Sequence, residues 1–266
     1  MKYVNLHNHT VYSDGKNTVR ENVEQALRLG MGAIGFSDHS HTAIDERYCM
    51  MPDAYAAYER EIRSIAAEYE EKIPVLLGIE LDYYSEPLPI RLDYTIASVH
   101  YIVKDTAVHA IDSTPEKQLR CFEESFGGDR IAAAEAYYQN LTTHVRRTNP
   151  TFVGHFDVIT KFSLIPEDDK RYRDLARDAL SEVVKHCPYV EINTGAISRG
   201  WRTTPYPQQY LLSHLLEIGG RPVLGADSHK IEHLTYAFDE AVELLRACGF
   251  SSIFAFGKNG YEEVKI

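Results

Sequence analysis

Short apolar runs alternate along the chain with longer segments whose apolar residues recur at helical spacing. Residues 19–31 illustrate the second kind, because Val19, Val23, Ala26 and Leu27 fall on one face of a helix. The apolar runs are bounded by polar and turn-forming residues, which is typical of strands. Strands are expected within residues 2–10, 33–40, 74–83, 93–103, 151–159, 188–196, 221–229 and 251–256, and helices within 19–31, 53–72, 129–147, 171–186, 207–218 and 232–247.

This regular alternation predicts an α/β fold with parallel strands. The strands are nearly continuous apolar runs, so both of their faces are expected to be covered, and this favours a closed (β/α) barrel over an open doubly wound sheet. A chain of 266 residues without a recognisable linker or repeat suits one barrel domain over residues 1–266. Residues 103–128 are expected to be a long irregular loop, which is usually functional or mobile.

Composition and charge narrow the class of protein. No apolar stretch reaches the roughly 18 residues that span a membrane, and no export signal begins the chain, so a soluble, cytoplasmic protein is expected. The four cysteines lack the spacing of a zinc ribbon or a disulfide framework. A formal net charge of −11 argues against nucleic acid as the main ligand, because phosphate backbones require clustered Lys and Arg. It suits a site in which carboxylates hold cations.

The candidate chemistry lies at the ends of the predicted strands. His7 and His9 are two residues apart on the first strand, so their side chains point the same way and can hold one ion. In a parallel barrel all such strand ends meet at one rim. The metal-capable residues expected there are His7, His9, Asp14, His39, Glu80, His100, His155, Asp227 and His229.

These nine residues exceed the three or four ligands of one zinc ion, so two or three ions are expected. Mixed imidazole and carboxylate ligands suit Mn, Fe or Zn, and Glu80 can bridge two ions. Other polar and apolar side chains are expected to be structural. They are the histidines His109, His144, His186, His214 and His233, and the helical stripe Tyr55, Tyr58, Ile62 and Ile65.

Six motifs carry a family resemblance: LHNHT with SDG, FSDHS, GIELDY, SVHYI, GHFD and GADSH. In this order, and over nearly the whole chain, they resemble the polymerase-and-histidinol-phosphatase (PHP) superfamily. The segment EINTGAISRGWRTTPYPQQYLL is similar to the histidinol-phosphate phosphatases of histidine biosynthesis. The resemblance implies a distorted (β/α)7 barrel of TIM-like type with its active site at the C-terminal rim.

The resemblance also implies a centre of three divalent ions and a distribution of the ligands. Asp14 stands where some relatives have a histidine, a difference expected to weaken the third site or alter its selectivity. One ion would take His7, His9, Glu80 and Asp227; a second Glu80, His100 and His155; and a third Asp14, His39 and His229.

The implied activity is hydrolysis of L-histidinol phosphate to L-histidinol and inorganic phosphate, by attack of a metal-bound hydroxide at phosphorus. Glu80 would bridge the ions that hold this hydroxide, and Asp227 is the expected proton donor to the leaving group. Arg199 fits a phosphate clamp. Lys161 and Arg202 are further candidates for the phosphate, and His41, Asp38, Asp157 and the acidic residues 103–113 for the ammonium and imidazole of the substrate.

Two other interpretations remain open. A PHP phosphoesterase acting on another small phosphoester, a phosphotyrosyl peptide or a nucleic-acid end would keep the same centre, although the negative charge and the lack of a Lys/Arg run argue against a polynucleotide. A metal-stabilised domain without activity is the other, and the complete set of nine competent residues argues against it. The oligomeric state stays open.

Overall fold

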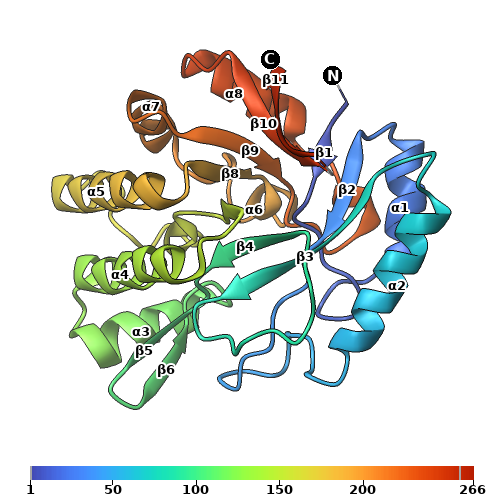
Figure 1. Cartoon of the computed structure of the whole chain (residues 1–266). Coiled ribbons are helices and arrows are strands. Elements are labelled where there is room, and N and C mark those ends of the chain that lie inside the picture. Colours follow the sequence, from blue (N-terminus) through green and yellow to red (C-terminus); the bar gives the residue numbers. More distant parts are fainter. Residues whose placement is uncertain (1, 258) are drawn as a thin grey trace.

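A parallel sheet forms the centre of the computed structural model, which describes residues 2–257 and 259–266 (Figure 1). Its seven described strands follow the order β1-β2-β3-β4-β7-β8-β9, and every neighbouring pair is parallel. The bounds are β1 Val4–Asn5, β2 Ala33–Phe36, β3 Val75–Asp82, β4 Tyr94–Ser98, β7 Phe152–Val153, β8 Tyr189–Asn193 and β9 Arg221–Gly225.

The sheet nearly closes on itself just beyond its first and last strands. Asn8 and Ser228 form a parallel bridge. The backbone N–H of His9 donates to the carbonyl of Ser228 at 2.8 Å, and that of Ser228 donates to His7 at 3.1 Å. Closure therefore occurs at the level of the predicted metal ligands, and the expected TIM-like barrel is confirmed.

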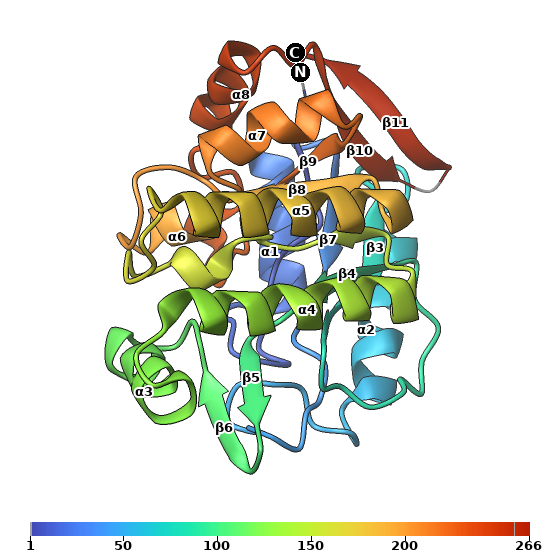
Figure 2. The ribbon, with the colours of Figure 1, turned by 90° about the vertical axis from the view of Figure 1, so that its left-hand side faces the viewer.

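Helices cover the outside of the barrel, and Figure 2 shows α4, α5 and α7 side by side across one flank. In α2, the predicted stripe from Tyr55 to Ile65 is buried, as expected for core packing. A capping box of Thr18 and Glu21 begins α1. The helices are α1 Val19–Arg28, α2 Tyr55–Glu68, α4 Arg130–Thr148, α5 Lys170–His186, α6 Gly195–Ser198, α7 Gln209–Glu217 and α8 Phe238–Ala247, with 3₁₀ turns at Val158–Thr160 and Ile231–His233.

The expectation of an irregular region over 103–128 is wrong. The predicted strand 93–103 ends at Ser98, and the chain then forms an antiparallel hairpin of β5 Tyr101–Lys104 and β6 Ala107–Ala110, followed by α3 Pro115–Phe126. Thr114 caps α3, and Gly127, with φ of 58°, ends it. We call residues 101–126 the insertion, because they leave the barrel between β4 and α4 (Figures 1 and 2).

The final predicted strand also differs, because it pairs outside the barrel sheet. Strand β10 Ser252–Gly257 forms an antiparallel hairpin with β11 Gly260–Lys265. Phe254, Phe256 and Tyr261 of this hairpin pack in one cluster with Tyr94 and Phe152, the first residues of β4 and β7. The hairpin thus covers the N-terminal end of the barrel, opposite the predicted site. Among the described residues, no helix combines the length and apolarity needed to cross a membrane.

Candidate metal centre

The nine predicted metal-capable side chains come together at the C-terminal end of the barrel. Seven are buried, whereas Asp14 and His229 are half-buried. Their ligand atoms fall into four overlapping groups, within each of which all atoms lie within 4.8 Å of one another. The groups are His9, Asp14, His39 and His229; His7, Glu80 and His155; His7, His9 and Asp227; and His39, Glu80 and His100.

Glu80 lies at the middle of the cluster, on β3. Its Oε1 is 2.8 Å from His155 Nε2 and 3.3 Å from His100 Nε2. Its Oε2 is 3.4 Å from His7 Nε2 and 3.6 Å from His9 Nε2. The two oxygens thus face different sets of histidines, which is the arrangement a bridging carboxylate requires.

Asp227 completes the group around His7 and His9. Its Oδ1 is 3.3 Å from His9 Nε2 and 3.9 Å from His7 Nε2. Both histidines lie just after β1, and their Nε2 atoms face the same Asp227 oxygen, as their spacing predicts. Asp227 has a φ of 46°, and a residue held in this left-handed region is often one whose side chain serves a function.

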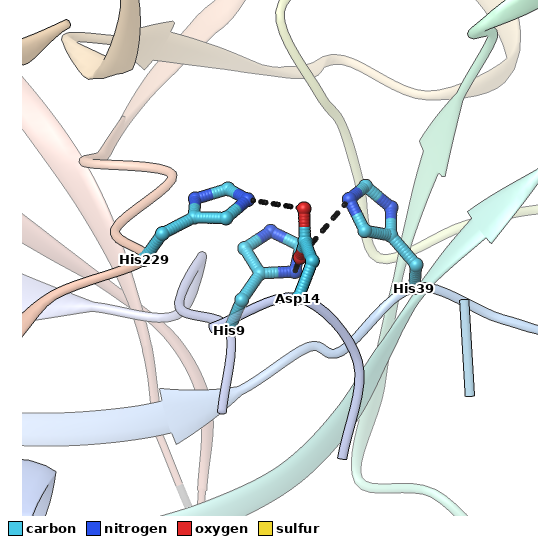
Figure 3. A group of neighbouring side chains, drawn as sticks. All are labelled: His9, Asp14, His39 and His229. Carbon is cyan, nitrogen blue, oxygen red and sulfur yellow. Dashed lines mark hydrogen bonds and ion pairs between the residues drawn. The ribbon is translucent and has the colours of Figure 1, made fainter. Parts of the chain in front are cut away.

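Asp14 lies among three histidines from three separate segments of the chain (Figure 3). Its Oδ2 is 3.1 Å from His229 Nε2, and its Oδ1 is 3.8 Å from both His39 Nε2 and His9 Nδ1. The structure therefore places His9 between two groups, with Nε2 facing Glu80 and Asp227 and Nδ1 facing Asp14. The resemblance had assigned His9 to the first of these groups alone.

The chemistry of the cluster fits divalent cations. His7 Nε2, both ring nitrogens of His9, Asp14 Oδ1 and Glu80 Oε2 are buried, and none has a hydrogen-bond partner in the described part of the chain. Burying so many unpartnered polar atoms is costly unless something else binds them. Convergent imidazole nitrogens and carboxylate oxygens are the ligands that Mn, Fe and Zn accept.

Two carboxylates that the sequence analysis did not single out orient the histidines from behind. His7 Nδ1 donates to Glu191 Oε1 at 2.7 Å, and His100 Nδ1 donates to Asp82 Oδ2 at 3.1 Å. Each bond leaves the Nε2 lone pair directed at the cluster. The sequence did carry signals for both carboxylates: Glu191 is a charged residue inside the apolar strand 188–196, and Asp82 follows Glu80 by two residues.

The charges around the cluster shift the histidine pKa values in both directions: burial lowers that of His9, whereas the neighbouring carboxylates outweigh burial and raise the pKa values of His7, His39 and His100. Burial and the neighbouring His229 and His39 lower the pKa of His9 to about 3, so its ring is neutral. Burial alone would raise the pKa of Asp227, but Arg199 and His7 hold it well below its ordinary value. An aspartate that stays ionised is a good ligand and a poor proton donor, so this supports the ligand role predicted for Asp227 over its predicted acid role.

A cavity of about 460 Å³ opens onto the cluster, and two of the predicted phosphate-binding cations line it. Arg199 Nη2 donates to Asp227 Oδ2 at 2.7 Å, while the buried Nε of Arg199 has no partner among the described residues. Lys161 Nζ donates to the carbonyl of Asp112 at 2.6 Å.

The structure does not bring Arg202, His41 and Asp157 to this cavity. Arg202 Nη1 donates to the carbonyl of Thr160 at 2.9 Å, and the buried Asp157 accepts the N–H of Gln208 at 3.1 Å. His41 Nε2 lies 3.1 Å from Glu46. Asp38 is also occupied elsewhere, because it accepts hydrogen bonds from Thr10 and Ser13. Residues that line the cavity without having been singled out include Asp45, Arg47, Tyr48, Tyr101, Ser113 and Lys117.

The histidines expected to be structural are indeed elsewhere. His144 Nε2 bonds the carbonyl of Leu81 at 2.8 Å, and His109 Nε2 bonds Ser125 at 2.7 Å. Among the described residues, none of the metal-capable groups includes these two, His186, His214 or His233.

Comparison with known proteins agrees with this geometry. The sequence model of the PHP domain matches residues 5–195. The chain is 25% identical to the probable histidinol-phosphatase of Schizosaccharomyces pombe, over 94% of this chain and 88% of that one. It is 24% identical to the histidinol-phosphatase of Bacillus subtilis, over 89% of this chain and 97% of that one.

A solved structure shares the fold over almost the full length. The histidinol phosphate phosphatase of Lactococcus lactis, complexed with zinc, L-histidinol and phosphate, superposes with a TM-score of 0.71 at 22% identity, over 98% of this chain and 99% of that one. At this identity the likeness speaks for the barrel alone. The match to the PHP domain spans well over half of the chain and includes seven of the nine clustered residues. The chain therefore belongs to the PHP domain family.

Proposed function

We propose that this protein is a metal-dependent phosphomonoesterase that hydrolyses L-histidinol phosphate to L-histidinol and inorganic phosphate in histidine biosynthesis. The observation that carries the proposal is the convergence of nine imidazole and carboxylate side chains beneath a cavity lined by Arg199. Relatives named histidinol-phosphatase match over nearly their full length and nearly all of this chain, which supports the choice of substrate.

The centre is proposed to hold three divalent ions, which are Mn, Fe or Zn. The four groups support a multi-ion centre because they overlap: His7, His9, His39 and Glu80 each belong to two groups, and Glu80 lies with His155 in one group and with His100 in another. The zinc in the related L. lactis complex supports a divalent ion of this kind. The carboxylate of Glu80 faces both His7 and His155, which supports a bridging role.

Bound divalent ions supply Lewis acidity, because they lower the pKa of water and neutralise charge on a phosphoryl group in an in-line displacement. The chain's own residues supply position. Arg199 lines the cavity, and its hydrogen bonds to Asp227 already fix its guanidinium. It can therefore bind a phosphate without a further loss of side-chain freedom. Lys161 adds a second cation at the cavity wall. Glu191 and Asp82 keep His7 and His100 in the orientation that directs Nε2 inward.

The proposed substrate is a small molecule, with neither nucleic acid nor membrane as a partner. The cavity volume suits a small ligand, and the net charge of −11 disfavours a polynucleotide. A cytoplasmic site of action is proposed because biosynthetic enzymes act there and the four cysteines are unpaired. We propose one domain for residues 1–266, since the β10–β11 hairpin packs on the barrel.

Phosphate release tests the proposed function directly. The purified protein, before and after chelation and after addition of Mn²⁺, Fe²⁺ or Zn²⁺, would be given L-histidinol phosphate, p-nitrophenyl phosphate and a short 5′-phosphorylated oligonucleotide. We expect histidinol phosphate to be preferred, chelation to abolish turnover, and His9→Ala to lose metal and activity together. His186→Ala, at a histidine 43% exposed, is the matched control. Turnover of the oligonucleotide alone, or full activity without metal, would refute the proposal.

A further inference from the structure

The cavity has an inner half formed by the metal-capable residues and an outer half that the proposed chemistry does not use. The outer wall comes from two stretches of chain, residues 45–48 after β2 and the insertion. The two stretches are joined, because the Tyr101 hydroxyl donates to Asp45 Oδ2 at 3.1 Å. Part of the outer wall is therefore formed by residues that lie outside the barrel itself.

An aromatic surface begins directly beside the metal ligands. The ring of Tyr48 packs edge-on against His39, with centroids 4.7 Å apart, and lies 6.3 Å from His100. On the side of the insertion it stacks with Tyr101 at 6.0 Å and an interplanar angle of 28°. The hydroxyl of Tyr48 is buried and has no hydrogen-bond partner among the described residues. The Tyr48 ring therefore lies where it can contact the rest of a substrate whose phosphate binds at the cluster.

One carboxylate on this wall keeps free acceptor capacity. Asp112 lines the cavity with 22% of its side chain exposed. Among the described residues its carboxylate accepts no hydrogen bond, and its nearest cation, Lys161 Nζ, is 3.7 Å from Oδ2. The ammonium of Lys161 is instead directed at the Asp112 carbonyl, 2.6 Å away.

The other charges of the outer wall are already paired or face solvent. Arg47 is 76% exposed and is paired with Asp45. Lys117 Nζ donates to the Ser113 hydroxyl at 3.1 Å. Asp112 is also ion-paired, with Lys161, but the 3.7 Å separation is longer than a hydrogen bond, so the cavity-lining carboxylate keeps acceptor capacity for a ligand, and its negative charge favours a cation.

We propose that Tyr48 and Asp112 form the subsite for the leaving group of the phosphoester, Tyr48 stacking on a flat ring and Asp112 accepting hydrogen bonds from an ammonium. This inference rests on the proposed function and extends it by naming the residues that select the substrate. An aromatic face attracts flat and cationic groups, and a desolvated carboxylate binds an ammonium through charge-assisted hydrogen bonds. The ligand class is a small phosphomonoester whose alcohol carries both a planar ring and an amine.

The test compares three substrates on the metal-loaded enzyme: L-histidinol phosphate, p-nitrophenyl phosphate, which has the ring without the amine, and glycerol phosphate, which has neither. Asp112→Asn should raise KM about tenfold for histidinol phosphate alone, because only that substrate loses a charged hydrogen bond. Tyr48→Leu should raise KM several-fold for both ring-bearing substrates, and Tyr48→Phe, which keeps the ring, should stay within about twofold of wild type.

Matched controls are Asp168→Asn, at a fully exposed carboxylate, and Tyr236→Leu, at a tyrosine 44% exposed. Elemental analysis of each variant reports its metal content. Equal losses on all three substrates, with or without loss of metal, would overturn the subsite, as would unchanged KM values in Asp112→Asn and Tyr48→Leu. Wild-type protein that ignores histidinol phosphate but turns over p-nitrophenyl phosphate would overturn the proposed function instead, so the two failures are distinguishable.

Discussion

Glu191 shows how one residue can set the geometry of several others. Its Oε1 accepts from His7 Nδ1, while its Oε2 accepts the backbone N–H of His155 and the side-chain amide of Asn193, each at 2.8 Å. All of these partners are donors, so the site requires acceptor capacity on both oxygens. A carboxylate provides it and an amide does not.

Glu191→Gln should therefore weaken metal binding although it touches no proposed ion. The amide NH₂ would face either His7 or the two donors at Oε2, and the His7 ring would lose its fixed orientation. We expect metal affinity to fall roughly 10- to 100-fold, the usual effect of losing such an outer contact. Competition with a chromogenic chelator measures it, with Glu262→Gln, at an exposed position on β11, as the control. Equal affinities in wild type and Glu191→Gln would contradict this role.

Asp157 is fully buried beside Arg202 and outside the cavity. Burial raises its pKa from 3.8 to about 6, against the opposing effects of Arg202 and the Gln208 N–H. The folded protein thus favours the protonated acid more than the unfolded chain does. The stability that this preference contributes is complete below about pH 4 and is lost as the pH rises through about 6.

Asp157→Asn removes this pH dependence because an amide does not ionise. Between pH 4 and pH 7, wild type should lose up to about 3 kcal/mol of unfolding free energy relative to the variant. Denaturant unfolding of both proteins across this range measures the difference, and parallel curves would refute the prediction.

Because Asp157 does not line the cavity, we expect Asp157→Asn to change the activity on histidinol phosphate and on an aryl phosphate by the same factor. This differs from the substrate-binding role expected from the sequence.

Between neighbouring strands, a missing side chain makes room for the site. Gly225 on β9 lies where the Glu191 side chain of β8 passes, and a Cβ at Gly225 would come within 1.8 Å of Glu191 Oε1. Backbone conformation is not the reason for this glycine, since its φ is not positive. The close packing of strands β8 and β9 therefore couples a glycine in one strand to a histidine-orienting carboxylate in the next.

Gly225→Ala should displace Glu191 and act on both the fold and the centre. Overpacking of this kind costs typically 1–3 kcal/mol, so we expect a lower Tm together with weaker metal binding. Thermal unfolding and chelator competition measure the two effects. Gly257→Ala on β10 is the control, because a Cβ there meets no atom of the described residues within 4 Å. A variant with lowered Tm and unchanged metal affinity would break the proposed link to Glu191.

In the molecule as a whole, we expect metal binding and folding to be linked, because the proposed ligands come from segments as distant as His7 and His229. The unfolded chain does not gather them, so ions that bind only the folded state stabilise it by mass action. Closure of the barrel between Asn8 and Ser228 lies at the same level, and it joins the two ends of this ligand set.

Removing metal should therefore lower Tm by about 5–10 °C, the shift expected from a few kcal/mol of lost binding free energy in a chain of this size. Calorimetry of the metal-loaded protein with and without chelator measures it. His9→Ala, which should bind less metal, is expected to show a smaller shift. A metal-loaded wild type whose Tm ignores chelator would argue against the linkage.

The sequence by itself determined the barrel, its main helices and the nine metal-capable residues. Those depend on local regularities: apolar runs set strands, helical spacing sets the helices, and polar residues at strand ends share a rim because parallel strands all end there. His7 and His9 could be read as a pair since side chains alternate along a strand.

Only the tertiary structure decided which partners stand behind and around those residues. Glu191 reaches His7 across 184 positions, and Tyr48 meets Tyr101 only because the insertion folds back over the loop after β2. The insertion itself was missed although Thr114, Pro115 and Gly127 mark its helix, because its hairpin strands are short and lack a strong turn signal. Contacts between distant segments leave no periodic trace in the chain, so the metal-capable residues and the cavity cations Arg199 and Lys161 could be predicted, whereas the carboxylates Glu191 and Asp82 that orient the histidines, and Tyr48 on the cavity wall, could not.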